Sequence, residues 1–136
     1  MKDTLLRDLR NEDLYKSYVK ALGERQFSSM VEAVGYARKM PAKRFYIEGC
    51  TAAPIIQMIR DRISLVNLHP NSRKRIWRLY DDYCQYTSRN GSGKSLSSVM
   101  DILVNRPAPE FYLSDERARH IILDQRKAAK KRKGLA

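Results

Sequence analysis

Lysines and arginines gather at three places in this chain, and their chemistry is the strongest signal in the sequence. One cluster, residues 73–78, surrounds Trp77 near an expected helix start, and a second, Lys43 with Arg44, precedes a Phe-Tyr pair. The third cluster places six cations within residues 126–133, with no acid among them. Closely spaced cations neutralise phosphates and release their counterions without any special geometry. The three clusters therefore predict a surface that binds nucleic acid.

Two isolated arginines extend this prediction toward the reading of bases. Arg60 and Arg119 are expected on the outward faces of two helices that take the place of the recognition helix in a helix-turn-helix protein, where arginine can bind base edges bidentately. The likeness is one of element order alone, because residues 41–47 make a longer connection than the usual turn of about three or four residues. The predicted nucleic-acid-binding residues are Lys43, Arg44, Arg60, Arg73, Lys74, Arg75, Arg78, Arg119, Arg126, Lys127, Lys130, Lys131, Arg132 and Lys133.

A second candidate for phosphate chemistry is the segment 88–95, which ends in the Gly-Lys-Ser of a phosphate-binding loop. The leading glycine of that motif would stand at position 88, where this chain has Ser88. The segment also follows a helical pattern, whereas a nucleotide-binding fold would supply a buried strand. A solvated loop is the better interpretation.

The remaining reactive residues are too scattered for metal binding or catalysis. His69, His120, Cys50 and Cys84 show no spacing that would converge on one ion or pair a base with a nucleophile. The adjacent acids at 81–82 would point in different directions on a helix. We therefore expect no enzymatic activity, no catalytic residue, no metal, no cofactor and no small-molecule substrate.

Composition and charge limit the class of protein. The 136 residues contain 27 Lys and Arg against 15 Asp and Glu, a net charge of +12, and 43% of them are hydrophobic. This apolar content suffices for one globular domain or two very small ones. Two cysteines cannot build a disulfide framework, and neither a secretory leader nor an apolar run of the roughly 20 residues that a membrane span requires is present. We expect a cytoplasmic protein that does not bind membranes.

The chain also resembles itself at a spacing of about 65 residues, which predicts a tandem duplication. The pattern Leu-Tyr-x-x-Tyr at 14–18 recurs at 79–83, an offset of 65, and the Ser-Ser pair at 28–29 recurs at 97–98, an offset of 69. Pro-Ala-x-x-Phe-Tyr at 41–46 then recurs at 107–112, an offset of 66. This order of matches is hard to obtain by chance.

Each copy is expected to contain three helices, with a short extended strap before the third. Asn11 and Ser72 are candidate N-caps of the first helices, while Ser29 and Ser98 begin capping boxes with an acid three residues later. In an extended strap the Phe and Tyr rings would point in opposite directions. The predicted fold is all-α, a tandem duplication of a trihelical, helix-turn-helix-like unit. Its predicted domains are a first repeat at 1–66, a second repeat at 67–125 packed on the first, and a basic extension at 126–136 that continues the last helix.

These features favour a small nucleic-acid-binding protein over other classes. DNA is the preferred partner, bound through its phosphates, and RNA is a close variant of the same hypothesis. The alternative is a structural or adaptor protein that docks on an acidic protein partner in a nucleoprotein, mobile-element or viral assembly. Binding to phosphates should weaken steeply with salt, whereas a packed protein interface should change little.

Overall fold

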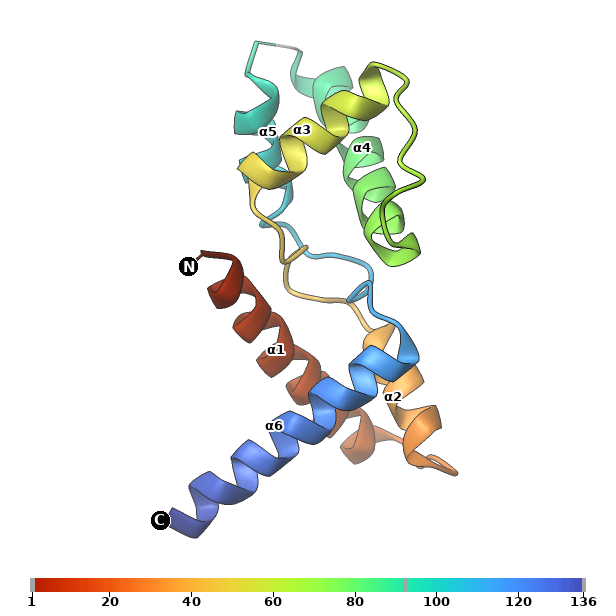
Figure 1. Cartoon of the computed structure of the whole chain (residues 1–136), viewed down its shortest axis with the longest axis vertical. Helices are drawn as coiled ribbons and strands as arrows, with labels where there is room; N and C mark the ends of the chain where they lie inside the picture. The colour runs from red at the N-terminus through yellow and green to blue at the C-terminus, as the bar shows by residue number, and fades with distance from the viewer. Residues whose placement is uncertain (1, 92, 136) are drawn as a thin grey trace. The chain divides into compact units, whose positions relative to one another are not determined.

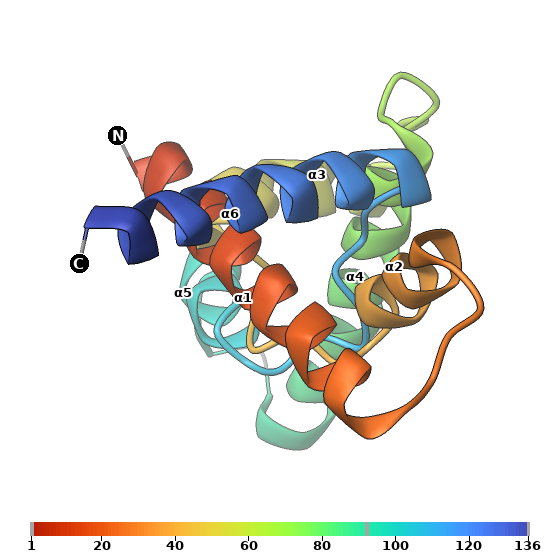
Figure 2. The same cartoon turned by 90° about the horizontal axis from the view of Figure 1, so that it is seen from below.

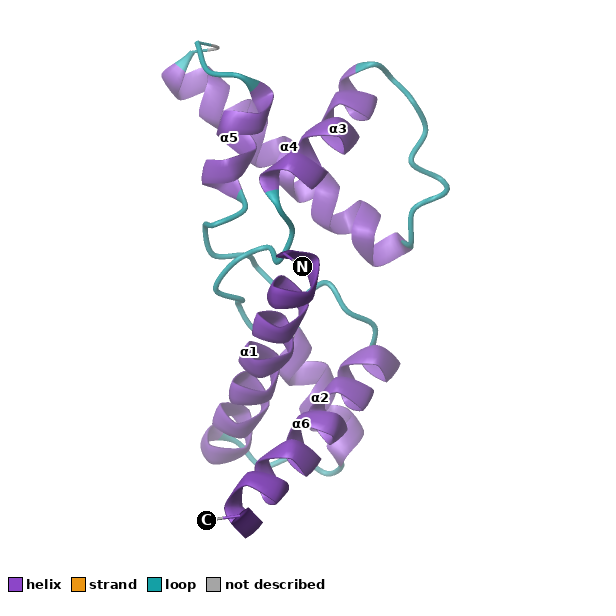
Figure 3. Ribbon diagram, turned by 60° about the vertical axis from the view of Figure 1, so that its left-hand side comes forward, coloured by secondary structure: helices purple, strands orange, loops and turns teal. Residues whose placement is uncertain are grey.

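The chain folds into α-helices joined by loops, as the computed structural model shows for residues 2–135 with the exception of Ser92 (Figures 1 and 3). No β-strand occurs in this described part, which confirms the all-α prediction. None of its helices combines the length and apolar character that a membrane crossing requires. The helices are α1 Lys2–Glu24, α2 Met30–Arg38, α3 Gly49–Arg60, α4 Pro70–Asn90, α5 Leu96–Leu103 and α6 Asp115–Leu135.

The helices form two compact units that do not follow the order of the chain. Unit 1 comprises residues 1–42 and 108–136 and contains α1, α2 and α6, whereas unit 2 comprises residues 43–107 and contains α3, α4 and α5 (Figures 1 and 2). The predicted repeat boundary between residues 66 and 67 therefore falls inside unit 2. Each unit takes its first two helices from one predicted repeat and its third helix from the other.

The core of each unit consists of small and branched apolar side chains at helical spacing. In unit 1, Leu14 on α1, Ala37 on α2 and Ile122 on α6 are completely buried, and in unit 2 Ile56 on α3 and Leu79 on α4 are equally so. Each fully buried Leu or Ile side chain contributes about 1.5–3 kcal/mol relative to exposure. The amphipathic helices are thus held mainly by the stripe that each buries against the other two.

Serine caps begin α2 and α5, but at only one of the two predicted positions. The Ser29 hydroxyl accepts a hydrogen bond from the Glu32 amide at 3.2 Å, as predicted. For α5 the prediction of Ser98 is wrong, because Ser95 is the N-cap and accepts from the Ser98 amide at 3.2 Å. The earlier start brings Leu96 into the helix and extends its apolar face. The two observed caps are separated by the same offset as the two Pro-Ala-x-x-Phe-Tyr segments.

The first helices of the two predicted copies also begin earlier than expected. Asn11 lies inside α1, because the apolar face extends back to the buried Leu6. Ser72 lies inside α4, which begins at Pro70 with His69 as N-cap; the His69 Nδ1 accepts from the Asn71 amide at 3.2 Å. Proline suits the first helical turn, where its missing amide has no helical partner.

Two straps, residues 41–47 and 107–113, carry the chain between the units. Ala42 and Ala108 form an isolated antiparallel bridge, in which each amide donates to the other's carbonyl at 2.8 and 2.9 Å. One strap continues with the Phe45 amide donating to the Val104 carbonyl, and the other with the Phe111 amide donating to the Arg38 carbonyl, both at 3.0 Å. The repeat offset relates the two donors, Phe45 and Phe111, and also the two acceptors, Arg38 and Val104.

The tyrosine of each strap has a left-handed backbone, which differs from the extended conformation expected there. The φ angle is 55° at Tyr46 and 57° at Tyr112, a conformation that costs a non-glycine residue about 1–3 kcal/mol. It interrupts the alternation of an extended segment, so that Tyr46 is buried as well as Phe45. Burial of both rings offsets the backbone strain.

Candidate nucleic-acid interface

The positive charge is shared equally between the two units. Unit 1 has 16 Lys and Arg against ten Asp and Glu, and unit 2 has 11 against five, so that each carries a net charge of +6. The charge is therefore even between the two units, although the second half of the chain is more basic than the first. Either unit has enough positive charge to attract a polyanion.

The most accessible group of cations lies on the C-terminal half of α6. The predicted tail residues are helical there, and every one of them is exposed. At 100° per residue, Arg119, Arg126, Lys130 and Lys133 fall on one side of the helix and span about 21 Å of its length. None of these four makes an ion pair with a described residue. The exposed cations of this group are Arg126, Lys127, Lys130, Lys131, Arg132 and Lys133, hereafter the α6 cations.

The cluster at 73–78 is divided by the structure into different roles. Arg75 is half-buried and its Nη1 donates to the Phe45 carbonyl at 3.4 Å, so that it supports a strap. Arg78 pairs with Asp82 one turn later on α4, at 3.2 Å. Lys74 is exposed and Arg73 is half-buried. This cluster consequently presents less uncompensated charge than its sequence indicates.

The predicted residues on the first strap and α3 are also partly engaged. Lys43 is exposed, whereas Arg44 is half-buried. The Arg60 guanidinium lies 5.7 Å from the ring centre of Tyr83, and its Nη1 donates to the Gln57 side chain at 3.4 Å. The Gln57 amide in turn donates to Asp61 at 3.0 Å. A base that approached α3 would have to displace these contacts.

Sequence reasoning missed a basic and aromatic group in unit 2. Lys94 and Arg106 lie 5.9 and 5.8 Å from the ring centre of Tyr86, on the last turns of α4. Arg106 and Arg89 also line a small pocket of about 80 Å³ together with Asp82. The group was missed because its cations are single residues outside the clusters of Lys and Arg, and folding brings them to the Tyr86 ring.

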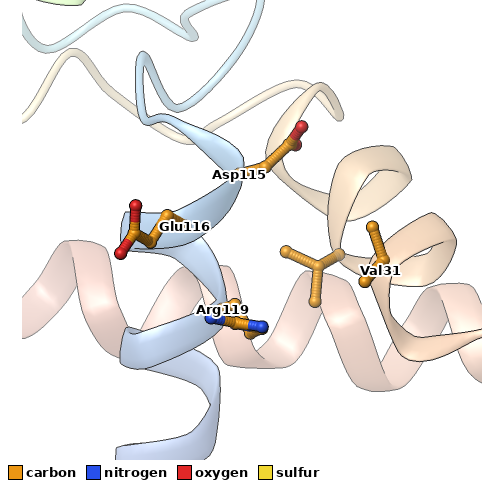
Figure 4. Close-up of a pocket in the computed structure, with 5 residues that line it drawn as sticks. Val31, Asp115, Glu116 and Arg119 are labelled. Carbon is orange, nitrogen blue, oxygen red and sulfur yellow. The ribbon is translucent and has the colours of Figure 1, made fainter.

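A larger pocket of about 220 Å³ lies between α2 and α6 in unit 1 (Figure 4). Its apolar wall is Val31 and Val34 from α2, and its rim consists of Asp115, Glu116 and Arg119 from α6. The two carboxylates make this pocket a poor site for phosphate. Of the predicted nucleic-acid-binding residues, only Arg119 contributes to it.

One tyrosine of α4 has a shifted pKa. A hydrogen bond to the Cys84 thiol and the charge of that group raise the pKa of Tyr80. Both cysteines are free and exposed. No group of three potential metal ligands occurs among the described residues.

The ion pair between Arg38 of α2 and Asp115 of α6 predicts a pH-dependent stability for unit 1. The Arg38 guanidinium lowers the pKa of Asp115, so the pair stabilises the fold above the ordinary pKa of about 4 and stops doing so as the pH falls below it. Because Asp115 is more than half exposed, Asp115→Asn should lower the unfolding free energy at pH 7 by at most about 1 kcal/mol. Thermal unfolding should show this difference at pH 7 and none near pH 2.5. A difference that persisted there would contradict the assignment.

Comparison with protein-family models, curated proteins and solved structures found no match to this chain.

Proposed function

We propose that this chain is a small basic nucleic-acid-binding protein that binds DNA mainly through phosphate contacts. The observation that carries the proposal is the set of α6 cations, which are exposed and share one helix without an ion pair to a described residue. Such cations have no ion pair with a described residue to break, and their binding releases the counterions of DNA. RNA is the close alternative, because phosphate contacts do not distinguish the two polymers.

Groove reading, where it occurs, is better suited to α6 than to α3. Arg119 is exposed and lies on the same side of α6 as the row of cations. Arg60 and Gln57 on α3 instead bond to each other. Phosphate contacts from the row would hold α6 along the duplex, with Arg119 on the same side, and arginine can bind base edges bidentately.

A salt titration tests this proposal directly. The full chain is titrated with random duplex DNA, single-stranded DNA and duplex RNA at 50 and 200 mM salt. If about six cations contact phosphates, the affinity for duplex DNA should fall by about a thousandfold over that range. Absence of binding to all three polymers at 50 mM salt would refute the proposal.

A second candidate function is that of an adaptor for an acidic protein partner. It is favoured by large apolar side chains on the surface of unit 1, where Leu5 and Val31 are each 61% exposed and Val19 is 50% exposed. Exposed apolar side chains on a unit with a net charge of +6 suit a partner with an acidic, partly apolar face. Binding to such a partner should depend only weakly on salt.

We also propose that the chain is a tandem duplication, with repeats at 1–66 and 67–125, whose third helices have exchanged places. A single offset relates the caps Ser29 and Ser95, the bridged Ala42 and Ala108, and the two left-handed tyrosines, which supports a common origin. Exchange of an identical element between repeats is a low-cost rearrangement.

The two exposed, unpaired cysteines are in keeping with a reducing, cytoplasmic setting.

A further inference from the structure

We propose that a contact between one glycine and one aspartate in each unit determines which third helix each helix pair accepts. The two docking surfaces are α1–α2, which binds α6, and α4–α5, which binds α3. The buried faces of the two third helices share two positions, since Ala52 and Ile56 on α3 correspond to Ala118 and Ile122 on α6 and all four are completely buried. They differ at the buried Ala53 of α3, whose counterpart on α6 is the exposed Arg119. The shared positions do not distinguish α3 from α6.

In unit 2, the first residue of α3 lies directly against α5. A Cβ atom on Gly49 would lie 2.8 Å from the backbone nitrogen of Asp101 and 3.0 Å from its Cα atom. Its nearest neighbour would be the Asp101 carboxylate. Only glycine fits at this point, so the α4–α5 surface requires a third helix that begins without a side chain.

In unit 1, the same contact occurs with the two residue types reversed. Gly35 lies on α2, and a Cβ atom there would lie 3.6 Å from the Asp115 Oδ1 of α6. Arg38, one turn further along α2, forms an ion pair with Asp115 and donates to the Leu113 carbonyl at 3.2 Å. The α1–α2 surface therefore accepts a third helix that begins with a carboxylate.

The two contacts are related by the repeat offset, and this gives them their selectivity. Under that offset, Gly35 corresponds to Asp101 and Gly49 corresponds to Asp115. If each third helix packed within its own repeat, Gly35 would face Gly49 and leave a void. Asp101 would face Asp115, and two apposed carboxylates repel each other.

Arg38 adds to the same preference. The corresponding position is the C-cap of α5, where the chain has Val104, so a local arrangement would bring Asp115 to a surface without that cation. Arg38 would in turn face Gly49 and lose its ion pair. The surfaces thus select α6 for α1–α2 and α3 for α4–α5, within one chain or between two copies of it.

The test moves the aspartate from α6 to α3 in the full chain. In the double variant G49D/D115G, the observed pairing would combine Gly35 with a glycine and Asp101 with an aspartate, while the local pairing would become complementary. NOEs between Val34 of α2 and Arg119 of α6, which line one pocket, report the observed pairing. We expect the double variant to lose these NOEs and to unfold at a Tm lower by about 5 °C or more.

A quadruple variant, G35D/G49D/D101G/D115G, keeps the result decisive if the double variant folds poorly. It restores one glycine and one aspartate to each observed contact, so the Val34–Arg119 NOEs should return. The variant G23D/D124G makes the same types of change at exposed positions and should retain the NOEs. Retention of the NOEs in the double variant, or their absence from the quadruple variant, would overturn the proposal.

Discussion

Replacing Lys127, Lys130, Lys131, Arg132 and Lys133 by glutamine is expected to abolish most of the affinity for duplex DNA. Each phosphate contact contributes about one to the slope of log K against log salt, so the slope should become shallower by about 3–5. At 50 mM salt the affinity should fall by at least about a hundredfold. The substituted side chains are all exposed, so the free energy of unfolding should change little.

The control for this variant removes the same charge from other parts of unit 1. Substituting glutamine at Arg7, Lys16, Lys20, Arg25 and Lys39, all exposed, leaves the same net charge of +7. Fluorescence anisotropy with a labelled duplex gives both slopes. An equal loss in the two variants would show that overall charge, and not the α6 surface, carries binding.

Gly49→Ala is expected to be the most destabilising of the glycine-to-alanine substitutions in this chain. Its Cβ would lie 2.8 Å from a backbone nitrogen of α5, which cannot move without shifting that helix. Overpacking of this kind costs about 1–3 kcal/mol, which corresponds to a Tm lower by about 5–15 °C for a unit of this size. Thermal unfolding followed by circular dichroism measures the shift.

Gly35→Ala is the matched control, because Gly35 also lies on a helix at a third-helix contact. Its added Cβ would make an ordinary contact of 3.6 Å with a side-chain oxygen. Alanine also favours the helix by up to about 1 kcal/mol over glycine. The Tm should therefore stay the same or rise. Equal destabilisation by the two substitutions would contradict the close approach at Gly49.

Local signals in the sequence were sufficient to predict the helical fold and several of its boundaries. Ser29 begins α2 as expected, and the Ser114 hydroxyl accepts from the Arg117 amide at 3.1 Å at the start of α6. These features depend on residues within one turn of each other. The start of α1 was missed because a local signal was misleading there. Asn11 has the chemistry of a cap, but the apolar face of the helix extends back to Leu6.

The choice of third helix could not be predicted in the same way. The faces of α3 and α6 share an alanine and an isoleucine at corresponding buried positions, so this apolar pattern does not assign either helix to a partner. Only contacts between residues far apart in the chain, such as the Arg38–Asp115 pair, separate the two arrangements. A pattern search along the chain has no access to such distances.

The sequence predicted the exposure of the cations at the end of the chain. It did not predict which cations contact residues far from them in the sequence. The cations at the end of the chain lie on a helix and are exposed, as their sequence indicates. Arg75 looks the same in the sequence, yet it donates to a carbonyl 30 residues away. The cations around Tyr86 were missed for the converse reason, since only folding brings them together.

Because the chain runs from unit 1 to unit 2 and back, the two units can complete their folding at different times during synthesis at the ribosome. Residues 43–107 emerge as one continuous stretch, whereas α1 and α2 must wait for α6, whose Asp115 follows Arg38 by 77 residues. At about 5–20 residues per second, that wait lasts about 4–15 s. During this wait, α3 is the only one of the two third helices that has been translated. It begins with a glycine, whereas Arg38 of α2 pairs with a carboxylate. Under the proposed selectivity, the nascent α1 and α2 remain without a third helix until α6 has been translated.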